Sequence, residues 1–305
     1  MARLEDVETF HNISFPGHMH TQKSLSYATS FQFQDSDIVI ITYPKSGTTW
    51  MQEMVSLVLN RGDPTLSTTT PNWARAPWLE HYYCPQVLCT ARCPRVITSH
   101  LPHQLLLPAL KASKAKVIYV FRNPKDVAVS YYYFHKMAKF LPEPGLFDDF
   151  LDKFLEGTVH YGSWFDHVNG WTNSVEDIEN FFHITYEEMW QDPRSSLQRL
   201  CAFLQRPLQE EEVASTLKHC SFGFMKENAM VNYTLVPQDI VDHSQGKFMR
   251  KGKIGDWKNT FSDVQSHRLD TVFKAQMQNS GLTFIWESLE AQKRTLRADT
   301  QTAAA

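Results

Sequence analysis

Four short runs of apolar residues predict the strands of a buried sheet. The first covers residues 37–42, and its centre, residues 38–41, is apolar without interruption. A strand of a parallel sheet that is covered on both faces has this pattern. Similar runs over residues 95–99, 116–121 and 181–185 predict three further strands. The sheet is therefore expected to lie between two layers.

Segments with helical periodicity lie behind and between these strands. Apolar residues recur every three or four positions from Met51 to Leu59, just after the first strand. The same spacing predicts helices over residues 124–138, 163–171, 193–204, 209–219 and 262–278. Strands that alternate with helices predict an α/β fold, here a single domain with a central parallel sheet flanked by helices. Ligands of such sheets bind beyond the carboxyl ends of the strands, so the residues there are the candidates for a site.

The chain of 305 residues divides into an N-terminal segment (1–30), one domain (31–286) and a polar C-terminal tail (287–305) that we expect to be flexible. No linker rich in proline, glycine or serine interrupts the domain. Residues 226–247, which include Pro237, have neither helical nor strand periodicity. A loop of this length in a compact domain is usually functional, so we interpret it as a candidate lid.

Composition restricts the class of protein. The chain has 30 basic and 33 acidic residues, a net charge of −3, which gives no general affinity for nucleic acid or membranes. It has no run of about 18 apolar residues that could span a membrane, and its charged start is not a signal peptide. We expect a cytoplasmic protein. Cys84, Cys89 and Cys93 cluster near His81, but their spacing is a poor match for a zinc site, so no metal is expected.

The loop after the first strand, Tyr-Pro-Lys-Ser-Gly-Thr-Thr-Trp at residues 43–50, is a candidate anion site. Backbone N–H groups and the dipole of the following helix favour an anion there. Gly47 lets the backbone approach a ligand, and Lys45 adds a positive charge. In the ATPase loop the lysine follows the last glycine, whereas Lys45 precedes Gly47. The strand over residues 116–121 ends at Arg122, where an ATPase would normally have an aspartate for Mg²⁺.

A histidine, His100, follows the strand over residues 95–99. Imidazole, with a pKa near 6.5, can take the proton of a hydroxyl acceptor near neutrality, although a lone histidine at a strand end more often caps or packs. Aromatic-rich walls would suit a flat apolar acceptor. The candidates for these walls, about half of which could equally be core residues, are Trp73, Trp78, Tyr131, Phe134, Met137, Phe140, Tyr161 and Tyr233.

Four segments, in this order, closely resemble motifs of the cytosolic sulfotransferase family: 43–50, 99–102 (Ser-His-Leu-Pro), 121–130 and 248–258. The resemblance extends from about residue 30 to about residue 286. It implies transfer of a sulfuryl group from 3′-phosphoadenosine 5′-phosphosulfate (PAPS) to a hydroxyl of a small apolar acceptor, a steroid alcohol or a phenol. The other product would be adenosine 3′,5′-bisphosphate (PAP).

The resemblance also implies roles for individual residues. His100 would be the general base, Lys45 would stabilise the leaving phosphate, and Ser130 would hold Lys45 away until the acceptor arrives. Arg122 and Ser130 would bind the 3′-phosphate, completed by Arg250. The full set of cofactor-binding residues that it implies is Lys45, Ser46, Gly47, Thr48, Thr49, Trp50, Arg122, Ser130, Tyr186, Cys220, Ser221, Phe222, Met225, Phe248, Met249, Arg250, Lys251 and Gly252.

The sequence departs from the family pattern in three places. Cys220 stands where many relatives have threonine or serine. Thr98 stands where the family often has lysine. Relatives that act on steroid alcohols can also lack this lysine, so the change bears on acceptor preference. The family's dimerisation segment, beginning here at Lys258, is degenerate, so a monomer and a homodimer both stay open. Two alternative functions remain: a nucleotide or small-molecule kinase, and a catalytically silent PAPS-binding module.

Overall fold

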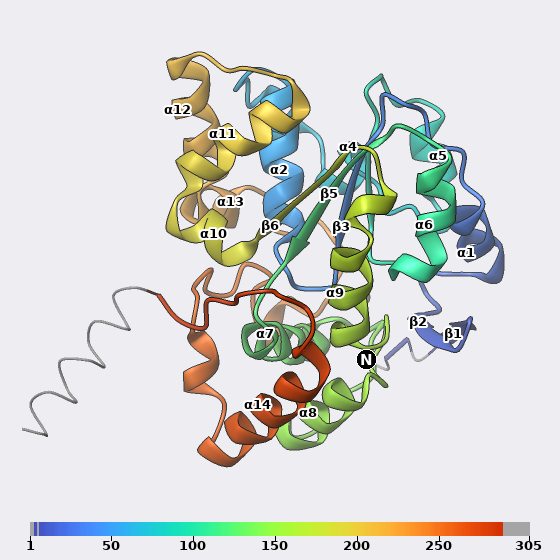
Figure 1. The fold of residues 1–305 in the computed structure, drawn as a ribbon, viewed down its shortest axis with the longest axis vertical. Coiled ribbons are helices and arrows are strands. Elements are labelled where there is room, and N and C mark those ends of the chain that lie inside the picture. Colours follow the sequence, from blue (N-terminus) through green and yellow to red (C-terminus); the bar gives the residue numbers. More distant parts are fainter. Residues whose placement is uncertain (1–2, 5, 289–305) are drawn as a thin grey trace, which may run out of the picture.

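A computed structural model describes residues 3–4 and 6–288 of the chain. Its centre is a four-stranded parallel sheet in the order β4-β3-β5-β6 (Figure 1). The strands are β3 (Ile38–Thr42), β4 (Val96–Ser99), β5 (Lys116–Phe121) and β6 (Phe181–Thr185). All four predicted strands are confirmed, two of them beginning one residue later than predicted.

The sheet separates two hydrophobic cores. Alternate residues of a strand point to opposite faces, so β3 contributes to both. Val39 and Ile41 pack in the core that contains α1, α6, α7, α8 and α9, whereas Ile38 and Ile40 pack in the core that contains α2, α11 and α12. Every residue of β3 is buried, as the uninterrupted apolar run predicted.

Fourteen α-helices and one hairpin surround the sheet in the described part of the chain. The hairpin strands are β1 (Val7–Phe10) and β2 (Ile13–Pro16). The helices are α1 (Gln22–Thr29), α2 (Thr48–Leu59), α3 (Thr65–Thr69), α4 (Asn72–Arg75), α5 (Cys84–Leu88), α6 (His103–Lys111), α7 (Pro124–Met137), α8 (Phe147–Glu156), α9 (Trp164–Asn173), α10 (Tyr186–Gln191), α11 (Pro193–Leu204), α12 (Glu210–His219), α13 (Phe222–Glu227) and α14 (Asp263–Met277).

The six predicted helices are present as α2, α7, α9, α11, α12 and α14. The α/β fold with a parallel sheet flanked by helices is therefore confirmed. Figure 1 shows α2 and α10–α13 gathered on one side of the sheet and α1, α5 and α6 on the other. The hairpin and the remaining helices were not predicted.

The N-terminal segment packs onto the rest of the domain. Phe15 and Leu25 are fully buried in the same core as Val39 and Ile41 of β3, and the ring of Phe15 lies edge-on to that of Tyr161. Of the predicted tail, all but the first two residues lie outside the described residues. No helix in the described ranges is long and apolar enough to cross a membrane.

Candidate active site

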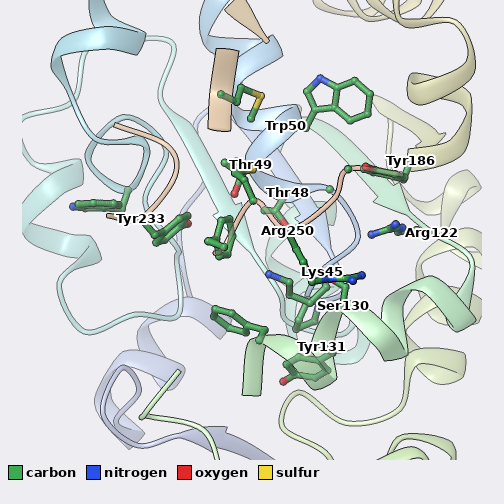
Figure 2. Close-up of a pocket in the computed structure, with 18 of the residues that line it drawn as sticks. Lys45, Thr48, Thr49, Trp50, Arg122, Ser130, Tyr131, Tyr186, Tyr233 and Arg250 are labelled. Carbon is green, nitrogen blue, oxygen red and sulfur yellow. The ribbon is translucent and has the colours of Figure 1, made fainter. Parts of the chain in front are cut away.

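A cavity of about 920 Å³ lies beyond the carboxyl ends of β3, β4 and β5. It brings together nearly all of the residues that the sequence singled out. Of the predicted catalytic, cofactor-binding and wall residues, only Ser46 and Met137 do not line it. Figure 2 shows Lys45, Ser130, Arg122 and Arg250 close together at one end.

The loop after β3 forms the floor of this end. Gly47 has a φ of 105°, and a Cβ there would lie 2.9 Å from the ring of Tyr186, so glycine is required on both grounds. Helix α2 begins at Thr48, whose hydroxyl hydrogen-bonds that of Thr42 over 2.7 Å. The loop thus presents the N-terminus of a 12-residue helix to the cavity, an arrangement that favours an anion.

The side chain of Arg122 is held by its neighbours, but its Nε has no hydrogen-bond partner. Its guanidinium lies 4.1 Å from the ring centroid of Tyr186, and its Nη2 donates to the carbonyl of Lys253 over 2.9 Å. Its Nε is buried and has no hydrogen-bond partner. A buried donor without a partner is costly, so this nitrogen suits a bound anion. Arg250, which also lines the cavity, forms an ion pair with Asp256 over 2.7 Å.

Lys45 is enclosed by aromatic rings. Its Nζ lies 4.2 Å from the ring centroid of Phe134 and 4.0 Å from that of Phe248. Burial lowers the pKa of Lys45 to about 7, and repulsion by Arg122 and Arg250 adds to the shift. The three cationic side chains of Lys45, Arg122 and Arg250 therefore lie close together beside the N-terminus of α2.

His100 stands at the end of β4, where the aromatic half of the cavity begins. Its Nδ1 lies 2.8 Å from the carbonyl oxygen of Thr42, which can only accept a hydrogen bond. The proton of the neutral ring therefore sits on Nδ1, and Nε2 keeps its lone pair. Burial lowers the pKa of His100 to about 4, so the imidazole is neutral at pH 7. The rings of Trp78 and Tyr161 flank it.

The described residues of the aromatic half offer little charge. Seven predicted wall residues line the cavity: Trp73, Trp78, Tyr131, Phe134, Phe140, Tyr161 and Tyr233. Among the described lining residues only Asp192 is acidic, and it lies between α10 and α11. Met137 is instead buried at the end of α7.

A family model described as the sulfotransferase domain matches residues 35–281. The chain belongs to the sulfotransferase family. Sulfotransferase 2B1 of Mus musculus is 48% identical over 282 residues, covering 92% of this chain and 83% of that protein. The 3-beta-hydroxysteroid sulfotransferase of Cavia porcellus is 43% identical over 247 residues, covering 81% of this chain and 85% of that protein.

A solved structure, mouse sulfotransferase SULT7A1 complexed with PAP, matches with a TM-score of 0.75 and 32% sequence identity. The match covers 90% of this chain and 95% of that one. The predicted family and fold are confirmed, and the assignment to a sulfotransferase family favours that interpretation over the kinase alternative.

In this sulfotransferase the thiol of Cys220 already has a partner. Its Sγ donates to the carbonyl of Thr216 over 2.9 Å, and burial raises the pKa of the thiol to about 12. Cys220 therefore contributes a neutral surface to the cavity. The ring of Phe222 packs against Gly252, where an added Cβ would lie 2.2 Å from it.

The predicted contact between Ser130 and Lys45 is not present. Ser130 lines the cavity from α7, but no hydrogen bond joins these two described residues, because the Lys45 ammonium lies over the aromatic rings. The holding role of Ser130 stays a prediction. Trp190, which sequence reasoning missed, also lines the cavity and donates to the carbonyl of Gly252 over 2.9 Å.

The acceptor half also contains residues that the sequence did not single out. Residues 226–247, the candidate lid, have no strand and only one short 3₁₀ turn after the end of α13. Their contributions to the wall, beyond Tyr233, are Leu235, Val236, Pro237, Ile240 and Val241. His18 and Met19 reach it from the N-terminal segment. These are mostly aliphatic side chains, which carry no local signal of a binding role.

Proposed function

We propose that this sulfotransferase transfers the sulfuryl group of PAPS to the hydroxyl of a small apolar acceptor, with steroid alcohols preferred and phenols second. The observation that carries the proposal is the placement of His100. Its unprotonated Nε2 belongs to a neutral, half-buried imidazole between a cationic end and an aromatic half of the same cavity.

The residues of the cationic end fit PAPS, which would supply an activated sulfuryl group next to a phosphate leaving group. The start of α2 and Lys45 would bind the 5′ end. Arg122, with its free Nε, and Arg250 would bind the 3′-phosphate, since the planar guanidinium matches phosphate oxygens. The PAP complex of mouse SULT7A1 supports this choice.

His100 would act as general base. Nε2 would take the proton of the acceptor hydroxyl, and the Thr42 carbonyl, 2.8 Å from Nδ1, would stabilise the imidazolium that forms. The backbone at His100 is held as well, because its N–H donates to Glu80 over 2.7 Å. A positioned base of this kind typically contributes about 10²–10⁴-fold to the rate.

Lys45 would stabilise the negative charge that develops on the leaving phosphate. Its ammonium comes from the loop after β3 and is shielded from water by Phe134 and Phe248. Electrostatic stabilisation is stronger in such a shielded site than in water. Ser130, from α7, would hold Lys45 away from the leaving phosphate until the acceptor arrives. No metal has a role in this scheme.

Two features support a neutral apolar acceptor. The wall is formed mainly by aromatic and aliphatic side chains, and no carboxylate faces its aromatic half among the described residues. A protonated amine would find no counter-charge there. The name of the Cavia porcellus relative, 3-beta-hydroxysteroid sulfotransferase, supports steroid alcohols. A cytoplasmic location and the choice between monomer and homodimer stay predictions.

Transfer of radiolabelled sulfate from PAPS tests the proposal, with steroid alcohols, phenols and amines as acceptors and EDTA present. We expect labelled steroid product without added metal. Labelled amines but no labelled alcohols would refute the acceptor class. Binding of PAP without transfer to any acceptor would favour the silent binding module, and a requirement for ATP and Mg²⁺ would favour a kinase.

A further inference from the structure

A chain of buried hydrogen bonds runs behind the wall of the acceptor half. The hydroxyl of Thr98, in β4, donates to the carbonyl of Ala76 over 3.0 Å and accepts from the Nε2 of Gln52 over 2.8 Å. The Oε1 of Gln52, in α2, accepts from the Nδ2 of Asn72 over 2.8 Å. Thr98, Gln52 and Asn72 are at most 1% exposed, and none of them lines the cavity. Thr98 therefore cannot touch an acceptor directly.

The chain ends on the cavity wall at Tyr233. The Nδ2 of Asn72 has two hydrogens: one goes to Gln52 and the other points to the hydroxyl of Tyr233, 3.3 Å away. The same hydroxyl faces the side chain of Thr49 in the phosphate-binding loop (Figure 2). Burial raises the pKa of Tyr233 to about 12, so the group stays a hydroxyl at neutral pH.

Asn72 also holds the backbone of this segment. Its N–H donates to the carbonyl of Met230 over 2.9 Å. Tyr233 itself has a φ of 64°, in the left-handed region that bulky residues rarely adopt. Such a conformation persists only where the surroundings impose it. The contacts from Asn72 are among the few polar ones that can do so.

The ring of Tyr233 connects the acceptor wall to the catalytic lysine. It packs against Phe248, with ring centroids 4.1 Å apart, and against Trp73 at 5.6 Å. Phe248 in turn covers the Nζ of Lys45 at 4.0 Å. A displaced Tyr233 ring would widen the acceptor half and loosen the ring above Lys45.

We propose that Asn72 is a positioning residue, which fixes Tyr233 through the Thr98–Gln52–Asn72 chain and so sets the width of the acceptor half for flat, rigid, multi-ring alcohols. The inference rests on the proposed function. It gives position 98 a route to the acceptor half without reaching the cavity, because Thr98 orients Gln52, which orients Asn72.

Two substitutions test the proposal. Asn72→Leu keeps the side-chain volume but removes both donors, and Tyr233→Phe removes only the hydroxyl. With PAP bound, the dissociation constant of a steroid alcohol is measured by quenching of tryptophan fluorescence, and its KM is measured with PAPS. Loss of one hydrogen bond should raise both constants about 2- to 12-fold. The double variant should be no worse than the worse single variant, because both substitutions break the same contact.

Selectivity distinguishes positioning from general damage. We expect the KM of a single-ring phenol and the dissociation constant of PAP to change less than the two steroid constants in both variants. Asn169→Leu is the matched control: its Nδ2 donates to the carbonyl of Gln276 over 3.0 Å, and Asn169 does not line the cavity. This control should bind steroid as the wild type does.

Wild-type steroid binding in both test variants would overturn the proposal, as would equal weakening of PAP, phenol and steroid. Should Asn72→Leu fail to fold, Tyr233→Phe alone decides by the same criteria. Failure of the proposed function would look different: the wild type would transfer no sulfate from PAPS, while the comparison of steroid affinities would still test Asn72.

Discussion

Binding of PAP should change the charge of Lys45. In the structure, burial lowers its pKa to about 7 from the usual 10.5, and repulsion by Arg122 and Arg250 contributes. A bound 5′-phosphate places negative charge beside the ammonium and so reverses the effect of the repulsion. The pKa of Lys45 should therefore rise towards its usual value when PAP binds.

The size of the effect follows from these two values. At pH 8, a pKa of about 7 leaves roughly one-tenth of the Lys45 side chains charged, whereas nearly all are charged in the complex. Binding should take up about 0.9 proton per site at pH 8 and about 0.1 at pH 6. Because the bound state holds the additional proton, affinity should fall as pH rises, by about fivefold between pH 7 and pH 8 and by nearly tenfold per unit above pH 8.

Titration calorimetry at pH 8 in two buffers of different ionisation enthalpy measures this uptake. The ligand phosphates are fully ionised there, since their second pKa is about 6. Lys45→Met should remove the part of the uptake that belongs to Lys45, whereas Lys251→Met, the same change at a lysine paired with Asp256, should keep it. Glu187, whose burial raises its pKa to about 7, contributes equally in both variants, so the difference between them reports Lys45. A heat independent of the buffer in the wild type, or an uptake in Lys45→Met equal to that in Lys251→Met, would refute the reasoning.

Three further predictions concern neighbouring residues. His100→Ala should lower turnover at least ~10²-fold, while calorimetry shows an unchanged affinity for PAP. Because burial lowers the pKa of His100 to about 4, the acid limb of kcat/KM for PAPS in the wild type should lie well below pH 6.5. An acid limb at pH 6.5 would contradict this assignment. Arg250→Ala should weaken PAP binding roughly 10- to 100-fold with kcat kept at saturating PAPS, and wild-type affinity would remove Arg250 from the phosphate site. Gly252→Ala should also weaken PAP binding, because its Cβ would meet the ring of Phe222 and its φ is 62°; an unchanged dissociation constant argues against this packing.

The sheet and the long helices were predictable because their signals are local. The run that forms β5 is bracketed by Lys116 and Arg122, and its bounds were predicted without error. Asn123 before a proline marked the start of α7, and its side chain accepts from the N–H of Asp126 as an N-cap does. Helices of four or five residues, such as α3 to α5, are too short to show a period. The β1–β2 hairpin likewise depends on distant packing, such as that of Phe15.

The two halves of the candidate site also differ in how far local sequence signals predict them. The cofactor half follows directly from motifs of consecutive residues at strand ends. Ile240 and its neighbours reach the acceptor half only because their loop pairs with the end of α7, through the bonds from Lys139 N to Ile240 O and from Asp242 N to Met137 O. The isolated bridge between Ala138 and Val241 belongs to this pairing. Neither partner carries a sequence signal for it.

Lys45 and His100, the two groups that we propose for catalysis, depend on each other through their charges. Burial is the main cause of the low pKa of His100, and the neighbouring charge of Lys45 lowers it further. An anion bound beside Lys45 would by itself favour protonation of His100 and so inactivate the proposed base. The same anion would charge Lys45, which opposes that protonation. A lysine with a pKa near 7 would therefore suit this position better than a permanently charged arginine, because its charge would appear when the proposed cofactor binds, at the moment when both the leaving phosphate and the neutral base would require it.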